Sequence, residues 1–175
     1  AGPYCSKLLA DMGAEVIKLE SPGQGDITRR RPPFKGDRPG PDNSGLFFFL
    51  NANKLSITLD PFHPAGKEAF FELIAKADLL IEDRSPVVME EAELDFKHLA
   101  KVNPRLVVTS ITPFGQTGPY RNYRAYPLNT FQSGGEGYLT PGASPYPRRP
   151  PLKWANFSGD YFCGVSAAGA TLLAL

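Results

Sequence analysis

Apolar residues recur at helical spacing in four segments of the chain. These segments span residues 3–12, 64–77, 94–102 and 161–175. The second would bury one side that carries Phe70, Phe71, Leu73 and Ile74. The last is so rich in small and apolar residues that we expect a buried helix.

Short runs of aliphatic and β-branched residues lie between the predicted helices. They span residues 14–19, 56–59, 78–82 and 106–111. The run at 78–82 is apolar through its middle, which is typical of a strand covered on both faces of a parallel sheet. Strands that alternate with helices predict an α/β domain with a mostly parallel sheet and flanking helices.

Proline and glycine interrupt the pattern in three long stretches. Residues 21–43, 113–127 and 138–151 are expected to be irregular, and a tight apolar cluster at 46–50 follows the first. Loops of such length in compact domains are usually functional or disordered.

Charge and composition describe an ordinary globular chain of 175 residues, which would usually form one domain. The 19 basic and 18 acidic side chains nearly cancel, so nucleic acid and anionic membranes are not expected partners. The basic runs at 29–31 and 148–149 are open to two interpretations, solvated loop charge or a place near a phosphate-bearing ligand.

Cys5 and Cys163 stand alone, without the spacing of a disulfide framework, and Cys5 is expected to be a buried thiol on the first helix. No apolar run approaches the roughly 18 residues that a membrane span requires. We therefore expect a soluble, cytoplasmic protein. Both ends of the sequence interrupt a predicted element, so we expect a fragment of a longer chain.

The motifs of several enzyme classes are missing. His63 and His98 are expected to be surface residues, and the sequence has neither a zinc-binding cluster nor a serine nucleophile motif. We therefore expect no metal site. A Gly-Gln-Gly turn at 23–25 is too incomplete to predict dinucleotide binding.

Asp160 closes a proline-rich loop and directly precedes the helix expected from residue 161. It could cap that helix through a side-chain hydrogen bond. It could equally be a nucleophile, because a helix N-terminus keeps a carboxylate ionised and stabilises charge that develops during acyl transfer.

The order of several sequence blocks resembles a known family. The run from Ala1 to Glu20 resembles the opening helix and strand of the class III CoA-transferases, which include formyl-CoA, carnitine and bile-acid CoA-transferases and 2-methylacyl-CoA racemases. Further matching blocks follow in family order at residues 25–29, 51–54, 56–60, 77–82, 103–106 and 114–120.

This resemblance implies a Rossmann-like fold within a two-domain protein whose chains interlock as a homodimer. Residues 1–175 would be an incomplete large domain that binds CoA and performs catalysis. The first strand and the C-terminal small domain would lie outside this sequence.

The resemblance also assigns chemistry to Asp160. It follows Gly159, ahead of the last helix and behind the Pro-Pro-Leu run at 150–152, as the acyl-accepting aspartate does in the family. The implied activity moves CoA from an acyl-CoA to a free carboxylic acid through a covalent aspartyl intermediate. Coenzyme A is then a substrate, and no tightly bound cofactor is expected.

The positions implied to contact CoA are Ala1, Leu59, Asp83, Arg84 and Arg124. The family's usual turn after the third strand is altered here to Glu-Asp-Arg-Ser-Pro-Val at 82–87, and the often basic positions 21 and 91 are Ser and Glu. Arg84 and Arg124 are candidate phosphate partners, or else members of surface salt bridges.

Two alternatives stay open. A racemase or epimerase on the same scaffold is disfavoured because Tyr126 occupies the position of the family's proton-transfer histidine, with Pro127 after it. A pseudoenzyme that binds acyl-CoA or only dimerises would fit the altered turn.

Overall fold

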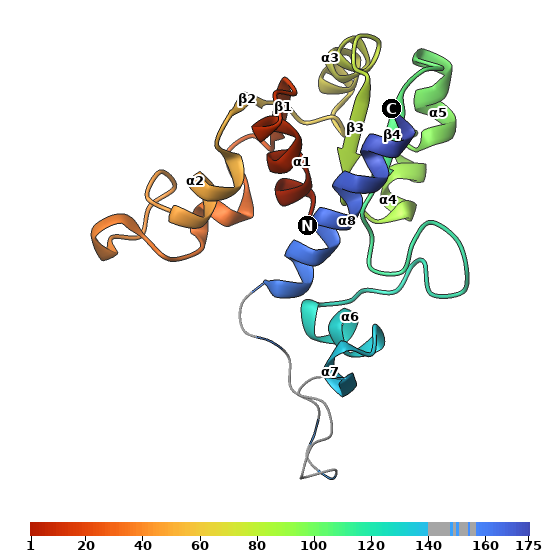
Figure 1. Ribbon diagram of the computed structural model, residues 1–175. Coiled ribbons are helices and arrows are strands. Elements are labelled where there is room, and N and C mark those ends of the chain that lie inside the picture. Colours follow the sequence, from red (N-terminus) through yellow and green to blue (C-terminus); the bar gives the residue numbers. More distant parts are fainter. Residues whose placement is uncertain (140–147, 149, 151–153, 155–156) are drawn as a thin grey trace.

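The computed structural model describes residues 1–139, 148, 150, 154 and 157–175. It confirms the α/β class and the parallel pairing (Figure 1). The loop expected at 138–151 lies mostly outside the described residues, as do two residues of the Pro-Pro-Leu run at 150–152.

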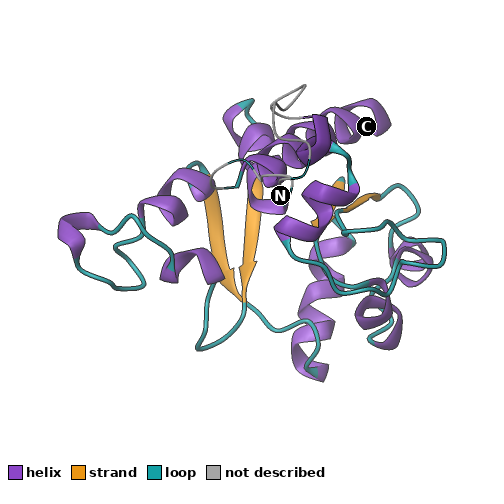
Figure 2. Cartoon of the chain, turned by 90° about the horizontal axis from the view of Figure 1, so that it is seen from below, coloured by secondary structure: helices purple, strands orange, loops and turns teal. Residues whose placement is uncertain are grey.

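The strands form two parallel pairs within the described part of the chain. In the first, β1 (Val16–Glu20) pairs with β2 (Lys54–Thr58); in the second, β3 (Leu79–Glu82) pairs with β4 (Val107–Ser110). Figure 2 shows β1 and β2 side by side with their carboxyl ends at the same edge. Side chains that follow such strands meet at one edge, where α/β proteins place their ligands.

The four helices expected from apolar spacing are present. They are α1 (Gly2–Asp11), α3 (Pro64–Ile74), α5 (Phe96–Val102) and α8 (Ser158–Ala174). The sequence pattern missed other helices, of four to seven residues: α2 (Gly45–Asn51), α4 (Pro86–Glu91), α6 (Pro127–Ser133) and α7 (Glu136–Leu139), as well as two 3₁₀ turns at Ile27–Arg30 and Lys35–Asp37. Both α4 and α6 begin with a proline, which interrupts a helical pattern but is well suited to a first turn.

The largest buried apolar cluster lies beside β3 and β4. It consists of Phe70, Ile74, Met89, Leu94, Leu99 and Leu106. Helices α3, α4 and α5 supply four of these residues, so this core fixes the helices around the second strand pair. Leu59, which follows β2, packs against the same cluster.

The last helix, α8, lies against both α1 and β4 (Figure 1). Its contact face carries Gly164, Ala168 and Thr171, all buried. The expectation of a buried helix holds for this face and is wrong for another, because a second set of apolar side chains on α8 is exposed: Phe162, Val165, Leu172 and Leu173.

The isolated cysteines and histidines fall mostly where expected. Cys5 is fully buried in α1, and burial raises the pKa of its thiol, whereas Cys163 is exposed.

His63 is exposed at the start of α3. His98 is only half-exposed because its ring contacts the Asp95 carboxylate that caps α5, which the expectation of a surface histidine did not include.

Residues 21–43 form a long irregular loop that Glu20 anchors to the end of β1. Arg29 forms two hydrogen bonds to the Glu20 carboxylate, of 2.7 and 2.8 Å, and its guanidinium lies 3.7 Å from the ring centre of Phe47. The hydrogen bonds from Arg29 lower the pKa of the buried Glu20 to about 2. Solvated loop charge is therefore the wrong interpretation for Arg29.

In the part of the chain that the structure describes, no helix is long and apolar enough to cross a membrane.

Candidate active site

Asp160 is the third residue of α8, because the helix begins at Ser158 rather than after Asp160. Phe157 occupies the cap position, and the capping role considered for Asp160 is therefore wrong. Among the described residues its carboxylate accepts no hydrogen bond, and its side chain is 37% exposed. A carboxylate in this position faces the positive end of the helix and is open to an incoming electrophile.

The beginning of α1 lies beside Asp160. The backbone nitrogen of Ala1, the cap residue of α1, is 3.7 Å from Oδ1 of Asp160. Two helix N-termini thus meet at one carboxylate. Their backbone dipoles provide positive potential and donors near any oxyanion that forms there.

A close crossing of α1 and α8 sets this arrangement. A Cβ atom on Gly164 would lie 3.0 Å from both the carbonyl oxygen of Ala1 and Cδ1 of Tyr4. Any larger residue would make an unusually tight contact with α1 at this crossing, and Gly164 lies four residues beyond Asp160 on the same helix face.

Asp83 faces the same helix start from the end of β3. Its Oδ2 lies 3.2 Å from the point that a Cβ on Gly2 would occupy. The structure therefore brings together Ala1, Asp83 and Asp160, three of the residues expected from the sequence. Asp83 is exposed, so it places a second carboxylate at the edge of the site.

Arg84, the next residue, points toward the turn that follows β2. Its guanidinium lies 5.8 Å from the ring centre of Phe62, and its backbone N–H donates to Glu82 Oε2 at 2.7 Å. Leu59 lies in the same turn region and lines a cavity of about 300 Å³ together with Pro22, Thr58, Asp60, His63 and Gly66. The Asp83–Arg84 pair thus connects the start of α1 to the surroundings of this cavity.

Arg124 is not joined to the other expected residues. It is exposed in the loop between β4 and α6, and in the described ranges neither Arg124 nor Arg84 forms an ion pair. The salt-bridge interpretation is therefore wrong for both arginines within that part of the chain. Tyr126, at the start of α6, is exposed.

Aromatic rings surround the base of the Asp160 turn. Tyr161 packs edge-on against Tyr4 at 4.7 Å between ring centres, and Phe49 lies 6.2–6.3 Å from both. Burial, followed by the nearby Tyr4 and Asp160, raises the pKa of the Tyr161 hydroxyl. Apolar spacing did not reveal this cluster, because its members come from three separate helices.

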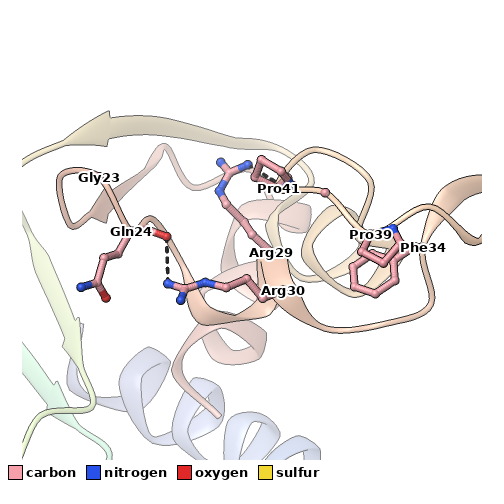
Figure 3. A pocket seen from close by; sticks show the side chains of 8 residues that line it. Gly23, Gln24, Arg29, Arg30, Phe34, Pro39 and Pro41 are labelled. Atoms are coloured by element: carbon pink, nitrogen blue, oxygen red, sulfur yellow. Dashed lines mark hydrogen bonds between the residues drawn. The ribbon is translucent and has the colours of Figure 1, made fainter.

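A second hollow of about 480 Å³ lies within the 21–43 loop (Figure 3). It is lined by Gly23, Gln24, Arg29, Arg30, Phe34, Pro39, Gly40 and Pro41. The sequence offered two incomplete signals for it, the basic run at 29–31 and the Gly-Gln-Gly turn at 23–25. The pairing of Arg29 with Glu20 could not be read from spacing.

The arrangement suits nucleophilic chemistry at a carboxyl group. Asp160 offers an oxygen without a hydrogen-bonded partner among the described residues, and two helix starts provide positive potential. No group of three or more potential metal ligands occurs in the described ranges. Such a site fits acyl transfer from an activated carbonyl compound.

Comparison with known proteins defines the class. The family model described as CoA-transferase family III matches residues 1–175, and the chain belongs to this family.

Particular relatives carry more specific names. An acetyl-CoA:oxalate CoA-transferase of Acetobacter aceti is 38% identical over 163 residues, covering 93% of this chain and 40% of the relative. A formyl-CoA:oxalate CoA-transferase of Escherichia coli O139:H28 is 38% identical over 176 aligned residues, covering 100% of this chain and 40% of the relative. The chain thus spans less than half the length of the curated relatives that it matches.

The fold agrees with a solved structure. A CAIB/BAIF family protein from Brucella suis superposes with a TM-score of 0.85 at 34% identity, covering 99% of this chain and 45% of that protein.

Proposed function

We propose that the protein containing this chain is a CoA-transferase that moves CoA from an acyl-CoA to a free carboxylic acid, with Asp160 as the nucleophile. The observation that carries the proposal is the accessible Asp160 carboxylate at the joint start of α1 and α8, in a chain of CoA-transferase family III. The names of the relatives support an acyl-CoA donor and a small carboxylic acid as acceptor.

The reaction proceeds by four nucleophilic substitutions, each at a carbonyl carbon. An Asp160 oxygen attacks the donor thioester and expels CoA thiolate, which leaves a mixed anhydride. The thiolate then attacks the Asp160 carbonyl, releases the donor acid as its carboxylate and forms an aspartyl thioester. The acceptor carboxylate attacks that thioester and expels the thiolate, and the thiolate finally attacks the acceptor carbonyl, which yields the new acyl-CoA and free Asp160. No net proton is gained or lost.

Groups near Asp160 could stabilise the intermediates of these substitutions and hold the substrate. The helix starts of α1 and α8 both lie beside the Asp160 carboxylate, so their free backbone amides are candidate donors to the oxyanions of the tetrahedral intermediates. The hydroxyl of Ser158 is buried without a hydrogen-bond partner in the described residues, two positions before Asp160, and is a candidate additional donor. Leu59, Asp83 and Arg84 would border the bound CoA, with Arg84 and Arg124 toward its phosphates.

Assembly and location belong to the same proposal. We place the full-length protein in the cytoplasm as an interlocked homodimer without a tightly bound cofactor. The apolar side chains exposed on α8 support a covering by further protein.

The test uses the full-length protein and a panel of acyl-CoAs, with hydroxylamine to trap acyl-enzyme species and mass spectrometry to locate them. A hydroxamate at Asp160 is expected. Asp160→Asn should abolish both the adduct and CoA exchange, because an amide cannot form the anhydride.

Asp83→Asn is the matched control, since it removes the other carboxylate at the start of α1. It should leave the hydroxamate at Asp160 in place. Measurable CoA binding with no adduct in any variant would reject the transferase proposal and favour a CoA-binding pseudoenzyme. Exchange of the α-proton of a chiral acyl-CoA would instead favour a racemase.

A further inference from the structure

The hollow in the 21–43 loop has walls that the fold holds in place (Figure 3). The two arms of the loop are joined by backbone hydrogen bonds from Lys35 N to Asn43 O and from Gly45 N to Pro33 O, both 2.8 Å. The buried Ser44 hydroxyl makes contacts of 2.7 and 2.6 Å with the carbonyl oxygens of Thr28 and Arg31. The hollow is therefore a built feature rather than a gap between loose segments.

One wall is apolar. It consists of the half-buried Phe34 ring together with Pro39, Gly40 and Pro41. The opposite wall contains the turn at Gly23 and Gln24. Such a space accepts a planar ring, because the Phe34 ring and the prolines exclude water from the face that packs against them.

Two arginines border the hollow, and their charges are compensated differently. Arg29 is engaged by Glu20 and by Asp42, with Nη1 3.2 Å from Asp42 Oδ1. Arg30 donates one hydrogen bond of 3.1 Å to the carbonyl oxygen of Gln24, and among the described residues it has no acidic partner. Figure 3 shows this bond holding the Arg30 guanidinium beside Gln24. Its remaining N–H donors and its positive charge are available to an anion.

We propose that this hollow binds the phosphate group of a nucleotide, with Arg30 as its cationic partner and the Phe34–Pro39–Pro41 wall against the base or sugar. A guanidinium offers several N–H donors in a plane that matches phosphate oxygens.

The cavity that adjoins the hollow indicates which molecule supplies the phosphate. Pro22 lines the cavity that contains Leu59, and the next residue, Gly23, lines the hollow, so the turn at 22–25 separates the two spaces. CoA carries a 3′-phosphate on its adenosine end and is long enough to occupy more than one adjacent space. This identity of the ligand rests on the proposed function, whereas the phosphate site itself does not.

The experiment measures binding of CoA, dephospho-CoA and inorganic phosphate to the full-length protein by calorimetry. Arg30→Gln is compared with Arg31→Gln, an adjacent and equally exposed arginine that does not line the hollow. Thermal unfolding of both variants verifies that the fold is retained, and both substitutions remove the same charge.

Arg30→Gln is expected to weaken CoA binding about tenfold, to leave dephospho-CoA binding unchanged, and to reduce the salt dependence of CoA binding. Arg31→Gln should change each value less than about twofold. A loss confined to inorganic phosphate would keep the phosphate site but assign it to a ligand other than CoA. If the two variants bind all three compounds alike, the inference is overturned.

These outcomes are separate from those of the transferase proposal. Absence of the Asp160 hydroxamate with a selective effect of Arg30→Gln would reject the transferase and retain the phosphate site. A hydroxamate at Asp160 together with equal behaviour of Arg30→Gln and Arg31→Gln would retain the transferase and reject the phosphate site.

Discussion

Asp160 shows that the role open to one side chain depends on where its helix begins. At the cap position its oxygen would be occupied by a backbone N–H. Because α8 starts at Ser158, the carboxylate lies in the first turn and accepts no hydrogen bond among the described residues. The three-residue difference between the expected and the observed start of α8 separates a structural carboxylate from one that can react.

Glu20 is the opposite case, a carboxylate fully engaged by its surroundings. It is 6% exposed and accepts hydrogen bonds from Arg29, from the Ser56 hydroxyl and from the Asp26 backbone N–H. Its pKa is about 2 in the folded protein against 4.5 in a free side chain. Its stabilising contribution is therefore complete above about pH 4.5 and is lost as the pH falls toward 2.

Glu20→Gln is expected to lower the free energy of unfolding of the full-length protein by about 3 kcal/mol at pH 7. The difference from wild type should shrink steadily between pH 4.5 and 2. Urea unfolding at several pH values measures both effects. Glu72→Gln is the matched control, since Glu72 is exposed on α3. A difference for Glu20→Gln that stays constant down to pH 2 would contradict this account.

At the scale of elements, α8 is positioned at two points. The close crossing at Gly164 sets its distance from α1, and Thr171 meets Thr109 of β4 with 2.7 Å between the hydroxyl oxygens. These contacts lie one turn and about three turns beyond Asp160. Together they fix both the distance and the rotation of the helix that carries the proposed nucleophile.

Gly164→Ala is expected to slow CoA exchange by roughly ten- to a hundredfold, because the added Cβ must displace α8 from α1 and shift Asp160. Steady-state exchange kinetics and thermal unfolding of the full-length protein are the measurements. Gly169→Ala, on the same helix with nothing within 4 Å of its added Cβ, should keep wild-type activity and slightly raise the unfolding temperature. Equal behaviour of the two variants would refute the crossing as a positioning contact.

Thr171→Val should cost about 1–3 kcal/mol of stability, because the half-buried Thr109 hydroxyl loses its partner. Denaturant unfolding of the single variants and of the Thr109→Val, Thr171→Val double variant measures the coupling. The double variant should be more stable than the sum of the two single losses implies, since no hydroxyl is then left unpaired. Strict additivity would show that the two hydroxyls do not interact.

At the scale of the whole molecule, periodic apolar spacing predicted the elements that build the core. Within the described residues, helices α1, α3, α5 and α8 and strands β1 to β4 were expected within a few residues of where they lie, because each carries a regular stripe or run of apolar side chains. Short helices such as α4 and α6 escaped prediction, since six or seven residues with an initial proline resemble a turn.

The candidate site was only partly predictable. Ala1, Asp83 and Asp160 were expected site residues from the family resemblance and lie around the start of α1, but the resemblance gave no distance between them. The Glu20–Arg29 pair and the hollow beside Arg30 depend on how an aperiodic loop folds back on itself, and no repeating pattern encodes such contacts.

The anchoring of the 21–43 loop has a consequence for the energetics of any ligand that enters it. A free loop of this length would have to be ordered when a ligand binds, at the expense of affinity. Here Glu20, Ser44 and the paired loop arms already restrict the backbone in the unliganded fold. The backbone of the loop therefore loses its conformational entropy during folding. A ligand that enters the hollow does not have to order the loop, so this entropy loss does not reduce its affinity.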